Sequence, residues 1–243
     1  ITWFATCRDK ILALKWDRAP FHWVWNYVMK AVKISLPIAV QSILMSGAQI
    51  ISTVIVAPLG NVAIAAHSFA ITAESLCYMP GYGIGDAATT LVGQTFGAGR
   101  SALCRSFARL TVGLGMSVMA AMGAIMYVFA PEMIALLSPV ADIQAIGASV
   151  LRIEAFAEPF FAASIVTYSI CVGAGDTLRP AIMNLASMWC VRLTLAAYLA
   201  RDYGLRGVWM AMAVELTFRG LLFLYRLFRG NWLKALEEKA PAA

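Results

Sequence analysis

The chain has 243 residues, of which 61% are hydrophobic and 13% charged, and its formal net charge is +6. Soluble domains usually contain about 45–50% apolar and about 25% charged residues, so a typical soluble domain is excluded. No charged residue lies between Lys33 and Glu74. The basic residues flank apolar runs and form no single patch, which argues against nucleic-acid binding. The composition therefore predicts an all-α protein that crosses a membrane several times.

The first 33 residues differ from the rest, because they mix basic residues with Trp3, Trp16, Trp23, Trp25 and Tyr27. This mixture favours the headgroup region of a bilayer, and we expect residues 1–33 to form a cytoplasmic or interfacial linker. No signal peptide is recognised, and the absence of an initial Met leads us to expect a fragment of a longer protein. Residues 226–243 are expected to be a cytoplasmic tail.

Residues 34–225 should form six transmembrane helices, because about 20 apolar residues suffice to cross the hydrocarbon core. Turns are predicted where glycine and proline gather, among them Pro58–Asn61, Gly97–Gly99, Gly173–Asp176 and Arg201–Gly204, and Pro131 and Pro139 should bracket the third connection. The six helices are predicted near residues 34–57, 61–83, 106–130, 145–171, 180–200 and 206–225.

The basic residues at the ends of these helices predict the orientation of the chain. Only Arg201 and Arg206 fall on one side, and both termini fall on the other. We therefore expect a multi-pass protein of the plasma or inner membrane. By the positive-inside rule, both of its termini are expected in the cytoplasm. Fourteen basic residues lie on that cytoplasmic side: Arg8, Lys10, Lys15, Arg18, Lys30, Lys33, Arg100, Arg105, Arg109, Arg179, Arg226, Arg229, Lys234 and Lys239.

The five cysteines show no CxxC spacing, and at least three lie within apolar runs. Small buried thiols are therefore favoured over disulfides or a zinc site, and no metal or cofactor is expected. The glycine-rich segment 93–100, GQTFGAGR, follows no strand and carries no GK[ST], which disfavours a phosphate-binding loop. Its small residues suit close helix packing and a tight reversal at the membrane surface.

Several motifs resemble those of the multidrug and toxic compound extrusion (MATE) family. They are Ala65–His67, Met79–Gly83, the run LVGQTFGAGR that ends at Arg100, Val172–Thr177 followed by Arg179 and Pro180, and Leu36–Ile38. The resemblance covers about residues 30–230.

The resemblance implies one six-helix bundle of a two-lobe, twelve-helix transporter, and the basic lead-in suggests the C-terminal half. It implies a lobe of a proton- or sodium-coupled efflux antiporter that exports cationic or amphipathic compounds by rocker-type alternating access. The implied partners are the bilayer, a small-molecule substrate and a missing N-terminal six-helix half. Some family members place a carboxylate in the first helix of this lobe, and this chain has none there.

Ionisable residues within spans are costly and are therefore candidates for function. Glu154 and Glu158 are four residues apart and are expected on one helix face, where both should not be ionised in a low dielectric unless a cation lies between them. Glu74 has no basic residue within a turn and is a candidate for cation or substrate binding. Arg152 and Arg192 are expected to be structural charges, as are Glu215 and Arg219, whose spacing suits an intrahelical pair.

Polar residues of the first span complete the candidate site. Gln41, Gln49 and Thr53, with Ser42, can share a polar stripe suited to a cavity wall. His67 is expected to be a packing residue or an interhelical donor. A lipid-linked saccharide flippase, favoured by in-span arginines, and a non-transporting membrane subunit remain alternatives. An intramembrane protease is disfavoured, because neither a GxSG serine nor HExxH occurs.

Overall fold

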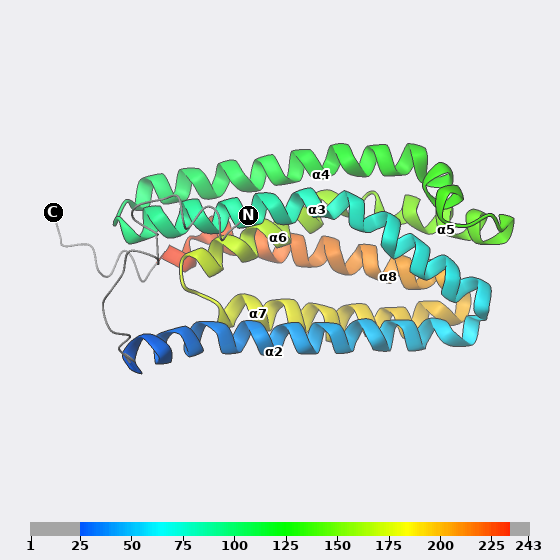
Figure 1. The fold of residues 1–243 in the computed structure, drawn as a ribbon, viewed down its shortest axis with the longest axis horizontal. Coiled ribbons are helices and arrows are strands. Elements are labelled where there is room, and N and C mark those ends of the chain that lie inside the picture. Colours follow the sequence, from blue (N-terminus) through cyan, green and yellow to red (C-terminus); the bar gives the residue numbers. More distant parts are fainter. Residues whose placement is uncertain (1–24, 234–243) are drawn as a thin grey trace, which may run out of the picture. The chain divides into compact units, whose positions relative to one another are not determined.

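The computed structural model describes residues 25–233, and all the regular structure in that range is helical (Figure 1). Residues 1–35 and 36–243 are two separate units, and 25–35, the described part of the first, are the opening turns of α2. Most of the expected linker, residues 1–33, and most of the expected tail lie outside the described residues. The elements are α2 (Trp25–Val56), η2 (Ala57–Leu59), α3 (Asn61–Gly97), α4 (Ser101–Leu137), α5 (Ala141–Glu154), α6 (Glu158–Gly173), α7 (Leu178–Ala186), η3 (Ser187–Arg192), α8 (Leu193–Arg229) and η4 (Asn231–Leu233).

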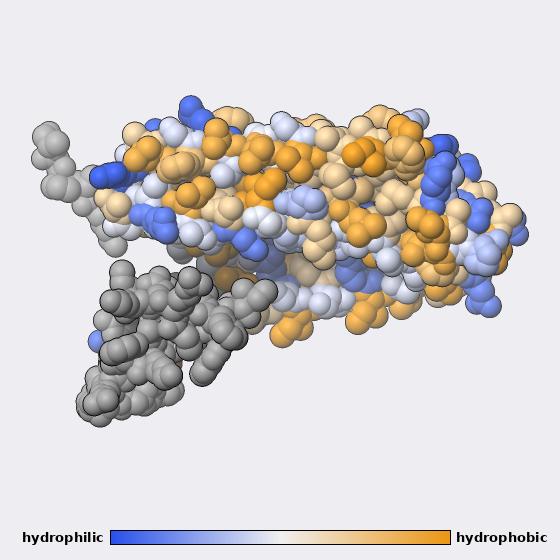
Figure 2. All heavy atoms as spheres, turned by 45° about the horizontal axis from the view of Figure 1, so that its top comes forward, coloured by the Kyte–Doolittle hydropathy of each residue, from blue (hydrophilic) through white to orange (hydrophobic). Residues whose placement is uncertain are grey.

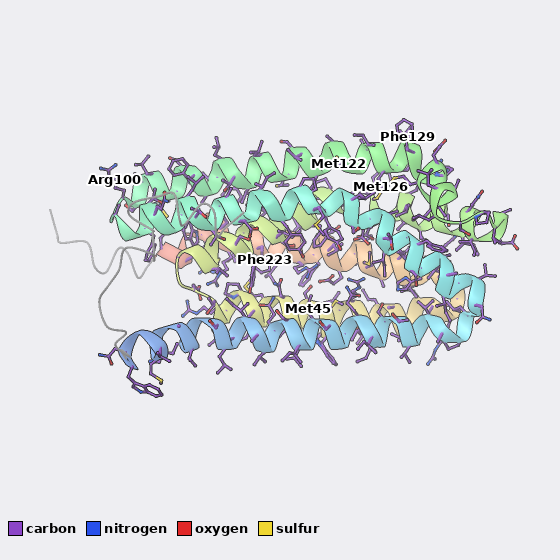
Figure 3. The ribbon with its side chains drawn as sticks, viewed as in Figure 1. Met45, Arg100, Met122, Met126, Phe129 and Phe223 are labelled. Atoms are coloured by element: carbon purple, nitrogen blue, oxygen red, sulfur yellow. The ribbon has the colours of Figure 1, made fainter. Side chains whose placement is uncertain are left out.

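Helices α3, α4 and α6 pack against one another, α8 packs on α6, and α5 packs on α3, α4 and α8. The part of α2 beyond residue 35 lies beside α7 and η3, where Ala48 forms a small apolar cluster with Met188 and Leu193. Met45 extends from α2 toward this cluster (Figure 3). On α4, Met126 is fully buried, whereas Phe129 is 52% exposed and points away from the other helices. The outer face of α4 is therefore apolar and suited to lipid.

Four described segments are each apolar and long enough to cross a membrane: Ala31–Leu59, Asn61–Gly97, Ser101–Leu137 and Leu178–Arg229. Helices α5 and α6 together pass the same test, but they meet at a bend of 59°. The last segment has 52 residues. As one straight helix it would measure about 78 Å, more than twice the hydrocarbon thickness.

This 52-residue segment is in fact an antiparallel hairpin. Gly204 has non-helical dihedral angles of φ 58° and ψ −137°, which an L-residue with a side chain would adopt only with strain. Ser187 and Glu215, 28 residues apart, are joined by a hydrogen bond of 2.6 Å. Along a straight helix they would be separated by about 42 Å. The chain therefore turns at the predicted position, Arg201–Gly204. With this segment counted as two arms and the α5–α6 pair as one span, the described part of the chain has six candidate crossings, the number predicted.

Two helices are longer than predicted. The predicted span at 61–83 continues to Gly97, and α4 extends from Ser101 through Pro131 to Leu137. Each has 37 residues and measures about 55 Å, so its ends project beyond a hydrocarbon core of about 30 Å. Pro131 lies inside α4 and does not end it. The prediction was wrong at these ends because it treated small residues and proline as the limits of the helices.

Candidate functional site

The three carboxylates expected to be functional are buried within the bundle. Glu74 lies in α3 and is 5% exposed, and Glu154 and Glu158 are each 1% exposed. Glu154 is the last residue of α5, and Glu158 is the first residue of α6. They lie on separate helices at the bend, which corrects the expectation of one face of a continuous helix over residues 145–171.

The bend has a cause in the sequence. Pro159 is the second residue of α6, and a proline in a continuous helix would clash with the carbonyl of Ala155, four residues earlier. Helix α4 lies close to the backbone here, because a β-carbon placed on Gly123 would meet Ala155 O at 2.8 Å and Glu158 Cβ at 3.2 Å. Glycine at position 123 therefore allows α4 to support the bend directly.

The carboxylate oxygens at the bend have no hydrogen-bond partners among the described residues. This applies to both oxygens of Glu154 and both oxygens of Glu158. An ionised carboxylate without a partner is very costly in an apolar interior. Each of these groups therefore requires a proton or a nearby cation.

Helix η3 is a π-helix, and it brings Ser187 and Arg192 to the same region. Residues five apart are about one turn apart in a π-helix, whereas in an α-helix they would point about 140° apart. Ser187 Oγ donates a hydrogen bond to Glu215 Oε1, and Arg219 Nε lies 3.3 Å from the same oxygen. Arg192 is buried between Met188 and Met212, with one guanidinium nitrogen 3.7 Å from Met188 Sδ.

These buried charges form one electrostatic cluster. Arg192 interacts with Glu74, Glu154 and Glu215, and Glu154 interacts with Glu158 as well. If every member were charged, four carboxylates would face two guanidinium groups. The cluster would then become neutral on taking up two positive charges, as protons or as metal cations. We call this set the buried charge cluster: Glu74, Glu154, Glu158, Arg192, Glu215 and Arg219.

His67 lies at the edge of the cluster, on α3. Its Nδ1 accepts a hydrogen bond of 3.1 Å from Trp209 Nε1, so it is an interhelical acceptor, where a donor was one expectation. Its Nε2 is buried and has no partner among the described residues, and its ring interacts electrostatically with Arg192. The contact with Trp209 ties α3 to α8.

A pocket of about 360 Å³ with polar, aromatic and aliphatic lining residues lies beside the cluster, between α2, α3, α6, α7 and α8. Tyr168 Oη donates a hydrogen bond of 2.8 Å to Gln41 Oε1 across it. Arg219 belongs to both the pocket and the cluster, so a molecule in the pocket would be close to the buried charges. The polar and aromatic lining residues are Gln41, Ser42, Tyr82, Asp86, Phe161, Ser164, Tyr168, Ser169, Asn184 and Arg219.

The family model MatE matches residues 37–198, which is the greater part of the chain and includes most of this site. The chain belongs to the MATE family. It is therefore a multi-pass membrane protein of a transporter family.

Curated relatives and solved structures agree with this assignment. This MATE chain is 28% identical over 212 residues to a probable multidrug resistance protein NorM of Thermotoga maritima, a match that covers 86% of the chain and 46% of that protein. The identity is 30% over 193 residues with a probable NorM of Pseudomonas aeruginosa, where 76% of the chain and 40% of the relative are covered. The chain spans about half the length of the curated relatives it matches.

The fold matches solved MATE structures over nearly the whole chain. A crystal structure of MATE in the straight conformation gives a TM-score of 0.83 at 19% identity and covers 98% of this chain and 53% of that chain. The Vibrio cholerae MATE transporter VcmN, in its bent form, gives a TM-score of 0.82 at 15% identity, with 92% and 50% covered.

The remaining candidate residues of this MATE chain lie outside the cluster. Gln41 lines the pocket, but Gln49 and Thr53 are exposed and are not part of its lining. Arg152, expected to be an in-span structural charge, is exposed on α5 and stacks on Tyr127. The first-span stripe is therefore divided between the pocket and the outer surface.

Tyr82 and Asp86 were not predicted as site residues, because the second span was expected to end at residue 83. Glu74, Tyr78, Tyr82 and Asp86 recur every four residues, a spacing that places them along one side of a continuing helix. The rings of Tyr78 and Tyr82 are in contact, with centroids 5.7 Å apart. This spacing was the available signal for the pocket wall on α3.

Proposed function

We propose that this chain is the C-terminal lobe of a cation-coupled multidrug efflux antiporter, driven by protons or sodium ions. The other lobe would be an N-terminal six-helix half of the same protein, since the chain spans about half the length of its relatives. The substrate would lie between the lobes and cross the membrane as one lobe rocks against the other. Such a protein moves its substrate without changing it chemically and is not an enzyme.

The main support for the proposal is that the carboxylates of Glu154 and Glu158 are buried without hydrogen-bond partners among the described residues. Four buried carboxylate oxygens without partners among the described residues, at the bend of a broken helix, form a place that needs protons or cations. Broken helices near ion sites are common in secondary transporters. A solved MATE transporter of this fold, ClbM, is described in complex with Rb⁺, which supports a monovalent cation as a ligand of such transporters.

The pocket supports a cationic or amphipathic substrate. Aromatic side chains, including Tyr82 and Phe161, lie in its wall beside amide and hydroxyl groups. Aromatic faces attract organic cations and also bury apolar groups. The nearby carboxylates would let protons or sodium ions and a cationic substrate compete for the same negative charge, which couples their movements.

The orientation is part of the proposal. With six crossings, the turn at Gly99 and the turn at Gly175 lie on the same side of the membrane as both termini. Arg100, Arg105 and Arg109 lie at the first of these turns, and Arg179 lies at the second. These positive charges favour a cytoplasmic location for that side and for both termini.

Efflux driven by one ion at a time tests the proposal. The full-length protein is reconstituted in vesicles, and export of a cationic dye is followed under an imposed proton gradient and, separately, under a sodium gradient. Glu154→Gln and Glu158→Gln should each abolish most of the export driven by the effective ion. Glu132→Gln is the matched control, because Glu132 is an exposed carboxylate on α4.

The two gradients also identify the coupling ion. Export should follow one gradient, and that dependence should disappear in the bend variants but not in Glu132→Gln. Undiminished gradient-driven export in both bend variants would refute a coupling role for this site. Absence of dye movement in the unmodified protein under either gradient would refute the efflux assignment itself.

A further inference from the structure

Arg152 is a charged residue in a membrane-embedded segment without a carboxylate to balance it among the described residues. Its side chain is exposed on α5, where Nε donates a hydrogen bond of 3.3 Å to Tyr127 O. The guanidinium lies 5.7 Å from the centre of the Tyr127 ring. Within the described part of the chain, no carboxylate lies within ion-pair distance of it. Arginine within spans normally faces the protein interior and is paired, so this exposed and unpaired arginine is suited to bind an anion from outside the protein.

A second arginine indicates the depth of Arg152 in the membrane. Arg206, two residues beyond the Gly204 turn, donates a hydrogen bond of 3.1 Å from Nε to Ser149 Oγ. Ser149 therefore lies near the Gly204 turn, which the proposed six-crossing topology places at the edge of the membrane. Arg152 is three residues further along α5, or about 4.5 Å. It thus lies close to the level of the lipid phosphates.

An apolar groove of about 500 Å³ begins at the aromatic partner of Arg152. Tyr127 and Phe156 are in edge-to-face contact, with centroids 5.5 Å apart, and both line the groove. From Tyr127 the groove continues along α4 to Ala120, about 10 Å toward the middle of the membrane.

The groove lies on an apolar side of the molecule. Phe156 is 72% exposed, and Val128 is 61% exposed. Figure 2 shows hydrophobic residues along the face over α4 and hydrophilic residues gathered at the end where α4 meets α5. A charged group above an apolar groove has the chemistry of a site for one lipid molecule.

We propose that this site binds an anionic phospholipid, with its phosphate on Arg152 and one acyl chain in the groove between α4, α5 and α6. The charge complements Arg152, and the apolar lining complements the chain. The groove wall includes Gly123, Ala155 and Pro159, the residues that form and support the bend. A bound lipid therefore packs against the outside of the bend, opposite the carboxylates, and should stabilise the protein.

The test measures lipid binding by the full-length protein in detergent. Phosphatidylglycerol is titrated against the unfolding temperature and, by native mass spectrometry, against the number of bound lipids. Phosphatidylcholine and inorganic phosphate are the comparison probes. Phosphatidylglycerol should raise the unfolding temperature more than phosphatidylcholine does, and inorganic phosphate should have no effect.

Variants distinguish the contribution of the Arg152 charge to lipid affinity from the contribution of the apolar groove. Arg152→Gln should weaken phosphatidylglycerol binding about fivefold, as expected for one charge near a lipid surface, and Arg152→Lys should retain most of it. Ala124→Phe, which fills the groove, should lower the affinity for this lipid while leaving the charge in place. Arg201→Gln, an exposed arginine at the same end, should bind phosphatidylglycerol normally.

Three outcomes would overturn the proposal. The first is equal stabilisation by the two phospholipids, and the second is unchanged phosphatidylglycerol binding in Arg152→Gln. The third is stabilisation by inorganic phosphate alone, which would mean a free-anion site and no lipid site. These readouts do not depend on transport.

Discussion

Ser187 and Glu215 lie on opposite arms of the helical hairpin formed by residues 178–229 and are joined by a hydrogen bond of 2.6 Å between Ser187 Oγ and Glu215 Oε1. Ser187 is the first residue of the π-helix, and Glu215 also pairs with Arg219. One carboxylate oxygen thus accepts contacts from both helices of the hairpin. The other oxygen, Oε2, has no partner among the described residues.

We expect Ser187→Ala to destabilise the full-length protein by about 1–3 kcal/mol, because a buried carboxylate loses a donor. Thermal unfolding in detergent measures the effect. Ser117→Ala is the control, since Ser117 is exposed and bonds only within its own helix. If the two variants unfold at the same temperature, the bond to Glu215 contributes nothing to stability.

Gly123→Ala should destabilise the protein by about 1–3 kcal/mol, because the added methyl group would meet Ala155 O at the bend. It should also reduce ion-driven efflux, since the bend positions Glu154 and Glu158. Gly113→Ala on the same helix meets nothing within 4 Å and should be neutral or stabilising by up to about 1 kcal/mol. Opposite signs for the two variants in one unfolding assay would support close packing at the bend, whereas equal effects would argue against it.

Arg219→Gln should cost about 3–5 kcal/mol of stability, because it removes the ion-pair partner of the buried Glu215 carboxylate. Adding Glu215→Gln should recover much of that loss, since the remaining pair is neutral. Arg229→Gln, at an exposed position, serves as the control. Equal stability of the single and double variants would mean that the two charges are not energetically coupled.

Tyr168→Phe removes the hydroxyl that bonds to Gln41 across the pocket. We expect a higher dye concentration for half-maximal efflux, with the sensitivity to the driving ion unchanged. The exposed Tyr198→Phe is the matched control. If Tyr168→Phe leaves the concentration dependence unchanged, this bond does not contribute to substrate binding.

Much of the fold could be predicted from the sequence because lipid requires long apolar helices. The number of crossings and the reversal at Arg201–Gly204 were confirmed. The break between Glu154 and Glu158 was missed, although Pro159 was present to signal it. The extension of α3 to Gly97 was also missed, and with it the position of Asp86 in the pocket wall.

The cluster itself could be predicted only in part. In-span charges can be listed from a sequence, but which of them meet depends on the packing of helices. The sequence could not show that Arg192 would join Glu74 and Glu154 while Arg152 faced outward. A π-helix has no simple periodic signature, so the alignment of Ser187 with Arg192 also required the structure.

The two carboxylates at the bend, Glu154 and Glu158, belong to different helices, α5 and α6. The distance between the Glu154 and Glu158 carboxylates consequently depends on the angle between α5 and α6. A cation held by both would favour one angle, and by thermodynamic linkage that angle would raise the affinity for the cation by the same factor. Under the proposed coupling, ion occupancy would therefore change the 59° angle between α5 and α6 and so move the two helices.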